Sequence, residues 1–97
     1  MAMRFRLLYQ RKVVEEDIPR LPKTDAKRIR QAIEKKLTEH PEAFGKPLRR
    51  SLRGYRSLRV GDFRVVYRIE ETAVKIFLIA HRSVVYERYQ ERFHLTP

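Results

Sequence analysis

The chain has 97 residues, which is enough for one small domain and too few for two, and 42% of its residues are hydrophobic, so a modest core is possible. It contains no cysteine, which excludes disulfides and thiolate metal sites and fits a cytoplasmic protein. Its net charge of +11, from 23 Lys and Arg against 12 Asp and Glu, favours a polyanionic or acidic partner.

The first part of the chain predicts a strand and then two helices. The strand covers residues 3–10, MRFRLLYQ, and the N-terminus lacks the long apolar core and the cleavage site of a signal peptide. Val13, Val14 and Ile18 have roughly helical spacing, and Pro19 and Pro22 end that first helix. The second helix carries an apolar stripe at intervals of three and four residues: Ala26, Ile29, Ala32, Ile33 and Leu37. No apolar run approaches the about 18 residues of a membrane span, so no membrane association is expected.

The second half predicts three antiparallel strands and a closing helix. The strands cover residues 55–60, 63–70 and 73–81, and the helix covers residues 84–93. Gly61-Asp62 is a two-residue hairpin loop, and Glu71-Thr72 is a weaker candidate for the second turn. The order is therefore β-α-α-β-β-β with a short C-terminal helix. This indicates a single α+β domain over residues 1–97, in which two N-terminal helices pack on a small antiparallel sheet.

The first hairpin divides its side chains between two faces. A loop at Gly61-Asp62 pairs Arg59 with Arg64, although like charges that face each other on a sheet repel. One face is apolar and suits a helical cover; it collects Leu58, Val60, Phe63, Val65, Tyr67 and Ile69. The other face is basic and partly aromatic. A turn at Glu71-Thr72 pairs Arg68 with Lys75 and Arg64 with Ile79, which adds four residues to the basic face: Lys75, Phe77, Ile79 and His81.

The second half of the sequence also resembles a known protein family. The segment LRGYRSLRVGDFRVVYRIEETAVKIFLIAHRSVVYERY is similar to the C-terminal half of RelE-type toxins in the RelE/ParE superfamily. The matching elements are LRG, the LRVGDFRVVY hairpin, and HRSVVY after an apolar strand. The resemblance implies a RelE-like ribonuclease-type fold and a toxin held inactive by a protein antitoxin. RelE-like members cut mRNA in the ribosomal A site, whereas ParE-like members share the fold and poison DNA gyrase.

Cleavage of RNA through its 2′-hydroxyl needs a base, positive charge on the phosphorane and an acid for the leaving oxygen. Arg59 and Arg64 supply charge, and the resemblance adds Arg82 and Tyr86 from HRSVVY. Arginine cannot readily act as the base, because its pKa stays above about 12, so His81 is the candidate. RelE-like proteins often carry basic residues at both outward positions before the turn, and here one of them is Ser57, for which Arg53 or Arg56 can substitute.

The remaining basic residues of this region are candidates for binding RNA or the ribosome: Lys46, Arg49, Arg50, Arg53, Arg56, Arg68 and Lys75. The sequence has no His, Asp and Glu cluster with metal-ligand spacing, so neither a metal nor a cofactor is expected. The expected partners are an acidic, partly disordered antitoxin, the ribosome and mRNA. Three functions stay open: a ribosome-dependent mRNA endonuclease, a gyrase inhibitor, and a catalytically degenerate basic binding module, which Ser57 keeps possible.

Overall fold

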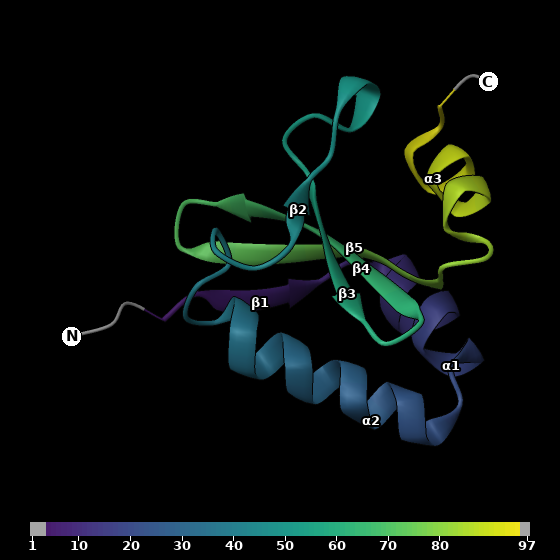
Figure 1. Ribbon diagram of the computed structural model, residues 1–97, viewed down its shortest axis with the longest axis horizontal. Coiled ribbons are helices and arrows are strands. Elements are labelled where there is room, and N and C mark those ends of the chain that lie inside the picture. The colour runs from purple at the N-terminus through teal and green to yellow at the C-terminus, as the bar shows by residue number, and fades with distance from the viewer. Residues whose placement is uncertain (1–3, 96–97) are drawn as a thin grey trace.

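The computed structural model describes residues 4–95 and confirms the predicted α+β fold (Figure 1). The predicted first strand began at Met3, which lies outside the described residues. Two N-terminal helices, a five-stranded sheet and a closing helix follow in this order: β1 (Arg6–Tyr9), η1 (Val13–Asp17), α1 (Ile18–Arg20), α2 (Lys23–Ala32) with its continuation η2 (Ile33–Leu37), β2 (Lys46–Pro47), η3 (Arg50–Leu52), β3 (Arg56–Val60), β4 (Phe63–Glu70), β5 (Ala73–His81) and α3 (Val85–Phe93). No helix within residues 4–95 is both long and apolar enough to cross a membrane.

The sheet is mixed rather than wholly antiparallel. Its strand order is β1-β5-β4-β3-β2, and the pairs β2–β3, β3–β4 and β4–β5 are antiparallel. β1 pairs with β5 in parallel, with Arg6 opposite Ala73 and Tyr9 opposite Ile76. A local pattern predicts strands but not the direction of an edge strand, because that direction depends on where the two intervening helices return the chain. β2 has only two residues and was not predicted.

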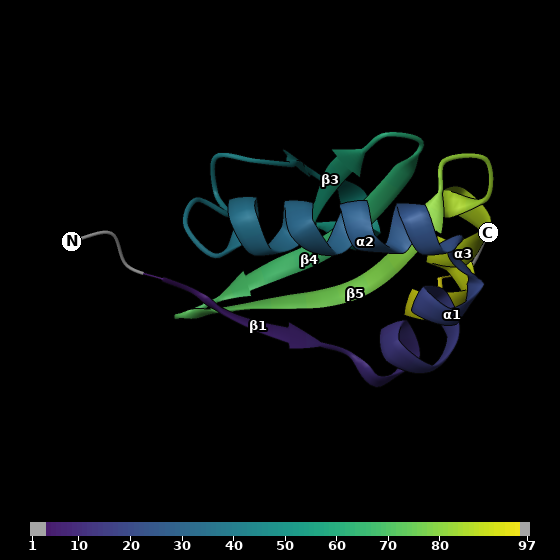
Figure 2. The same cartoon turned by 90° about the horizontal axis from the view of Figure 1, so that it is seen from below.

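The larger core lies between the sheet and α2, which crosses one face of the sheet (Figure 2). The predicted stripe of α2 and η2 supplies Ile29, Ile33 and Leu37, each at most 1% exposed. The sheet supplies the predicted apolar face of the hairpin, with Ile69 partly buried at its margin: Leu58, Val60, Phe63, Val65 and Tyr67. Burial of these side chains fixes the register, because a slip of one residue would turn every one of them toward the opposite face.

A β-bulge in β5 makes part of the predicted pairing wrong. Arg68 pairs with Lys75 as predicted, but Arg64 pairs with Ala80 instead of Ile79. The register shifts because Val66 pairs with Leu78 and Tyr67 with Ile76, so Phe77 is an extra residue on β5. Beyond a bulge the alternation of side chains is reversed relative to a regular strand. Ile79 therefore packs in the α2 core and not on the basic face.

The second face of the sheet is covered in part by α3. A smaller core forms there from Leu52, Val66, Leu78, Ala80, Val85 and Tyr89. Tyr55, Phe77 and Phe93 extend it through edge contacts, with ring centroids of Tyr55 and Phe93 4.9 Å apart. The face that was predicted to be open and basic is thus open only beside α3, where Arg59 and Arg64 lie.

The loop between η2 and β2 is fastened to the sheet by Tyr67. Its buried hydroxyl donates to the carbonyl oxygens of Pro41 at 2.7 Å and Phe44 at 2.5 Å, two possible acceptors for one proton. The Arg56 guanidinium donates to the carbonyls of Glu42 and Gly45 at 3.0 and 2.9 Å. Gly45 has φ +73°, and a Cβ there would lie 2.5 Å from the Tyr67 hydroxyl oxygen. The position therefore requires glycine for both its backbone and its space.

We predict that Gly45→Ala destabilises the protein by about 2–3 kcal/mol, since it adds a steric clash to the strain of a left-handed backbone. Gly54→Ala is the matched control, because Gly54 also has a positive φ of 99° but a Cβ there meets nothing within 4 Å. Urea unfolding gives the free energy of unfolding of each variant, and the difference between the two values measures the cost of the clash. Equal destabilisation would contradict the role given to Tyr67.

Candidate active site

The β3–β4 hairpin places two arginines opposite each other, as predicted. Arg59 pairs with Arg64 across the two strands, next to the Gly61-Asp62 turn, where Gly61 has φ +60°. Arg59 is exposed and Arg64 is partly buried. No carboxylate within residues 4–95 forms an ion pair with either of them. Their mutual repulsion is opposed by the apolar face beneath, and an anion between them would turn it into attraction.

These arginines line a pocket of about 570 Å³ between the hairpin and α3. Its walls come from three parts of the chain. The segment that contains β2 supplies Ala43, Gly45, Lys46 and Leu48, the β3–β4 hairpin supplies Ser57, Leu58, Arg59 and Arg64, and α3 supplies Val85, Tyr86 and Tyr89. Three cations and two phenols thus surround a partly apolar hollow. Such a lining suits a nucleotide, whose phosphate needs the charge and whose base needs a flat apolar contact.

The two tyrosines of α3 have different surroundings. Tyr86, which the sequence predicted, is 77% exposed, and its ring meets the edge of Tyr89 at a centroid distance of 5.8 Å. Tyr89, which the sequence analysis missed, is only 9% exposed. Burial raises the pKa of the Tyr89 phenol, and the nearby Ser57 and Arg64 act in the opposite direction. Tyr89 is therefore neutral at physiological pH and can donate a hydrogen bond into the pocket.

Ser57 stands where RelE-like proteins often have a basic residue. Its hydroxyl oxygen is buried, and although it lies near Tyr89, the two hydroxyls do not meet in the geometry of a hydrogen bond. A short neutral side chain leaves room beside Arg59 and Arg64. Neither predicted substitute, Arg53 or Arg56, lines the pocket. The Arg56 guanidinium is bound to the loop carbonyls of Glu42 and Gly45. Lys46 of β2 pairs with Ser57 across the two strands and also lines the pocket.

His81 does not lie on the arginine face. It pairs with Phe63 of the α2 core, and their rings meet at 5.3 Å with an interplanar angle of 88°. Its Nδ1 lies 2.8 Å from the Ser83 hydroxyl and accepts the Ser83 amide at 3.1 Å. The bulge at Phe77 accounts for this displacement, because it moves the last residues of β5 to the opposite face. The geometry gives no support to His81 as the base.

Arg82 lies at the hairpin end of the sheet but does not line the pocket. Its amide donates to the Asp62 carbonyl at 2.8 Å, and its guanidinium lies 3.6 Å from the Asp62 carboxylate. Both side chains are exposed, so the ion pair is weak and an anionic ligand can displace it.

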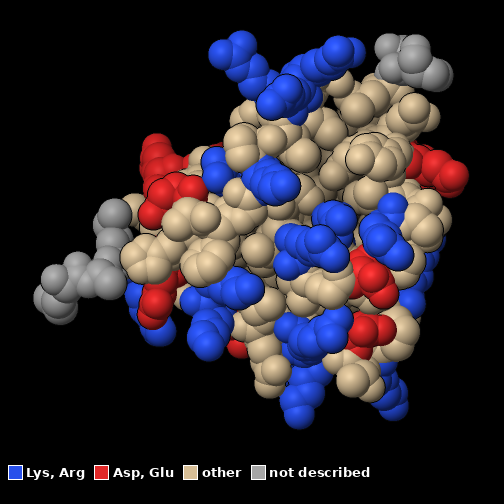
Figure 3. Space-filling model, viewed as in Figure 1, with Lys and Arg blue, Asp and Glu red and all other residues tan. Residues whose placement is uncertain are grey.

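The other predicted RNA-binding residues fall into two groups. Arg49, Arg50 and Arg53 are exposed on the loop that contains η3, where Lys and Arg side chains project at the top of the molecule (Figure 3). Arg68 and Lys75 lie farther along the sheet and both bind the carboxylate of Glu70. Lys75 and Arg68 together lower the pKa of Glu70, which keeps it ionised. The charge of the second group is therefore partly neutralised within the protein.

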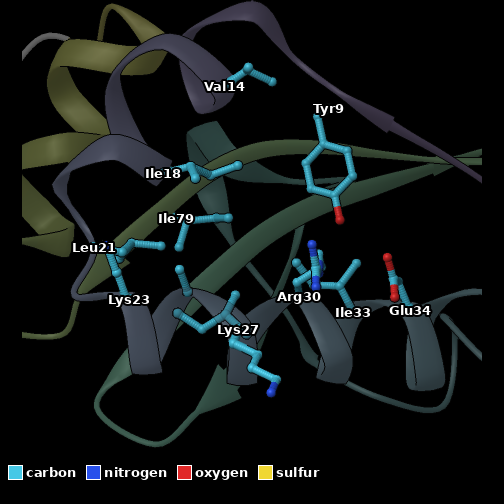
Figure 4. Close-up of a pocket in the computed structure, with 12 residues that line it drawn as sticks. Tyr9, Val14, Ile18, Leu21, Lys23, Lys27, Arg30, Ile33, Glu34 and Ile79 are labelled. Carbon is cyan, nitrogen blue, oxygen red and sulfur yellow. The ribbon is translucent and has the colours of Figure 1, made fainter.

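An apolar groove of about 500 Å³ lies on the other side of the molecule, between η1–α1 and α2 (Figure 4). Val14, Ile18 and Leu21 form one wall, and Ile29, Ile33 and Ile79 lie deeper. The rim is mainly basic; it consists of Lys23, Lys27 and Arg30 on α2, with one acid, Glu34, on η2. Val14 is 52% exposed although it is apolar. The sequence analysis did not predict this groove, because the residues that build it come from separate elements.

Within residues 4–95, no three His, Asp or Glu side chains gather in a group that could hold a metal ion.

Comparison with known proteins decides the family. Residues 5–86 match the family model described as the ParE toxin of the parDE type II toxin–antitoxin system. The chain belongs to the RelE/ParE superfamily of type II toxins. It is 42% identical to Toxin RelE of Mycobacterium tuberculosis over 72 residues, which cover 72% of this chain and 74% of that protein. It is 46% identical to Toxin RelG of the same organism over 54 residues, which cover 54% of this chain and 62% of that toxin.

Solved structures of similar proteins confirm the RelE-like fold. The RelBE2 toxin–antitoxin complex of Mycobacterium tuberculosis contains a chain that matches with a TM-score of 0.78 and 30% identity, over 84% of this chain and 94% of that one. A free mutant form of Escherichia coli RelE matches with a TM-score of 0.67 over 95% and 97% of the two chains, and at 13% identity it bears on the fold alone. Membership of a type II system implies a cognate antitoxin as the partner of this RelE/ParE toxin.

We predict that Arg59→Gln stabilises the folded toxin by about 0.5 kcal/mol at low salt, because it removes a like-charge cross-strand pair. Arg56→Gln is the matched control on the same strand; it should destabilise the protein by about 1–2 kcal/mol, since it removes two hydrogen bonds to loop carbonyls. Urea unfolding at low salt and at 1 M salt measures both effects. The gain from Arg59→Gln should vanish at high salt, where the Debye length is about 3 Å. A loss of stability for Arg59→Gln would contradict the repulsion.

Proposed function

We propose that this toxin is a ribosome-dependent endoribonuclease that cleaves translated mRNA in the A site and so inhibits translation. The observation that carries the proposal is the pocket in which Arg59, Arg64 and Lys46 surround a hollow faced by Tyr86 and Tyr89. The names of the similar proteins, Toxin RelE and Toxin RelG, support it, because the resemblance to RelE-like toxins implies cleavage of mRNA. The superfamily also includes gyrase inhibitors, which makes gyrase the alternative target.

The chemistry divides among the groups in the pocket. The 2′-hydroxyl of the RNA attacks the adjacent phosphorus, and the 5′-oxygen of the next nucleotide leaves, so a 2′,3′-cyclic phosphate forms. Arg59 and Arg64 bind the phosphate from both sides and stabilise the additional negative charge of the phosphorane. Guanidinium groups keep their protons, so neither arginine acts as the base.

Proton transfer is assigned to the tyrosines. Tyr89 is neutral because burial raises its pKa, and it lies near Arg64, so it donates a hydrogen bond to a phosphate oxygen. Tyr86 is exposed at the mouth of the pocket. Its phenol gives its proton to the leaving 5′-oxygen and takes up the proton of the attacking 2′-hydroxyl, so the step neither gains nor loses a proton. A site without an imidazole or carboxylate base is slow alone. Placement of the mRNA by the ribosome then supplies the orientation that the reaction needs.

We expect purified toxin to produce new breaks inside codons of a translated mRNA, mapped by primer extension in a reconstituted translation system. Arg64→Ala combined with Tyr86→Phe should lower the cleavage rate by about 10³-fold or more, because it removes a phosphate-binding charge and a proton-transfer group.

Arg11→Ala is the control for cleavage. It removes the same charge from an exposed residue paired with Glu15, outside the pocket, and should leave the rate unchanged. Unchanged breaks with the double variant would contradict the assignment of the site. Intact mRNA together with strong inhibition of gyrase supercoiling would instead establish the gyrase alternative, and the absence of both effects would leave a degenerate binding module.

We further propose that the antitoxin seats an amphipathic segment in the groove between η1–α1 and α2. The apolar walls fit one face of a helix, and the basic rim of Lys23, Lys27 and Arg30 fits acidic residues beside it. The RelBE2 complex, whose toxin chain is similar to this one, is a structure of a toxin with its antitoxin. An acidic partner also complements the net charge of +11.

Val14→Asp should weaken antitoxin binding at least tenfold, because it places a carboxylate on the apolar wall. Leu8→Asp is the matched control, since Leu8 is likewise exposed, at 38%, but does not line the groove. Calorimetric titration of each variant with the purified cognate antitoxin gives the two affinities. A similar loss with both variants would place the antitoxin elsewhere.

A further inference from the structure

A buried ion pair joins the N-terminal helices to α3. Asp17 at the end of η1 is 3% exposed and is the one charged residue within residues 4–95 that is buried to this degree. Its carboxylate accepts the Arg92 guanidinium through two bonds, 2.9 Å from Nη1 and 2.7 Å from Nη2. It also accepts the backbone amide of Ile79 at 2.9 Å, and Arg92 Nη1 donates to the Phe77 carbonyl at 2.7 Å. Every contact of the pair therefore leads to η1, β5 or α3.

Stability alone is a poor reason for such a pair. Removing two charges from water is expensive, and apolar replacements of a buried ion pair are often as stable or more so. What distinguishes a bidentate ion pair from an apolar contact is its fixed orientation. When two nitrogens of a guanidinium bind one carboxylate, the orientation of the guanidinium plane is fixed. Arg92 is further fixed by the Phe77 carbonyl at the β5 bulge. The pair consequently sets where the C-terminal end of α3 lies and how the helix is rotated.

The rotation of α3 decides the geometry of the pocket. Tyr89 lies three positions after Tyr86, and Arg92 lies three positions after Tyr89, so each is a neighbour of the next on the helix surface. The rest of the attachment is the apolar core around Val85, Tyr89 and Phe93. Within residues 4–95, no α3 side chain other than that of Arg92 forms a hydrogen bond to the rest of the protein. Tyr86 is 77% exposed, so packing does little to place its hydroxyl. A small rotation of α3 would move that hydroxyl away from Arg59 and Arg64.

We propose that Asp17 and Arg92 are a positioning pair for the cleavage reaction: their ion pair holds α3 so that Tyr86 and Tyr89 face the arginine pair. The inference rests on the proposed endonuclease function. Neither residue lines the pocket, and both act through the tyrosines. A displacement of about 1 Å at a reacting group can lower a rate about 100-fold, so a distant pair can have a large effect on turnover.

The decisive variant removes both charges together. Arg92→Met alone would leave the Asp17 carboxylate buried without its partner and can unfold the protein, whereas Asp17→Asn with Arg92→Met leaves no buried charge. The double variant should melt within about 5 °C of the wild type. We expect its kcat for mRNA cleavage to fall at least tenfold and its KM to stay within about twofold, because the cations that bind RNA are untouched.

Three comparisons separate positioning from a merely structural role. Tyr86→Phe should lower kcat much less in the double-variant background than in the wild type, since the hydroxyl is already misplaced there. Arg92→Lys keeps the positive charge beside Asp17 but lacks the planar guanidinium. Unlike Arg92→Met, it should fold, but its kcat should remain low. Arg88→Met is the matched control on the same helix, where Arg88 pairs with Glu91 on the surface; it should leave kcat unchanged.

Amide hydrogen exchange provides a readout that does not depend on activity. The double variant should exchange the α3 amides at least about tenfold faster, while the amides of the β3–β4 hairpin keep their protection. Wild-type kcat and α3 exchange in the folded double variant would overturn the inference. A wild-type toxin that does not cleave mRNA would instead refute the endonuclease proposal, and the exchange measurement would still decide whether the pair holds α3.

Discussion

The register of the β3–β4 hairpin is the constraint on which the rest of the site depends. Gly61 adopts a positive φ that a two-residue turn needs, and the apolar residues of both strands are buried against α2. Since side chains alternate, that burial forces Arg59 and Arg64 onto the other face, directly opposite each other. The repulsion between them is small beside the burial of five core side chains, so the fold tolerates it. The same repulsion favours the binding of an anion between the two guanidinium groups.

Only part of the second face of the sheet is open to solvent. α3 covers part of it through a compact apolar cluster, and the pocket lies between this helix, the β3–β4 hairpin and the segment that contains β2. The loop is in place because Tyr67 and Arg56 bind its carbonyls. Three segments distant in sequence therefore meet around the arginine pair. Each is held by contacts made outside the pocket, which leaves the polar groups inside it available to a ligand.

The two proposed surfaces lie on opposite sides of the sheet and are connected through Asp17, which lines neither of them. Asp17 belongs to η1, whose residue Val14 lines the apolar groove, and Asp17 also binds Arg92 of α3. An antitoxin segment in the groove would thus press on an element that is bonded to the helix carrying Tyr86. A small protein has few independent elements, so the apolar groove and the arginine pocket are linked through the contacts of η1 with α3.

Much of the fold follows from the sequence alone. The apolar stripe of Ile29, Ile33 and Leu37, the Gly-Asp turn and the alternation along β3 and β4 are local patterns, and each predicted its element and its buried face. The position of Arg59 opposite Arg64 follows from the same turn and the same alternation of side chains. Tyr86 came from the resemblance of HRSVVY to RelE-like toxins, and the family match supports that resemblance.

Only the tertiary structure decided the rest. The bulge at Phe77 has no local signal, because the extra residue is accommodated by the packing of Phe77 and Leu78 against α3. That bulge sends Ile79 and His81 to the opposite face and removes the imidazole from the site. The direction of β1, the use of Arg56 to hold a loop, the presence of Tyr89 in the pocket and the pairing of Asp17 with Arg92 all depend on contacts between distant parts of the chain. A sequence pattern predicts which face of a helix or strand is buried, but it does not predict which other element packs against that face.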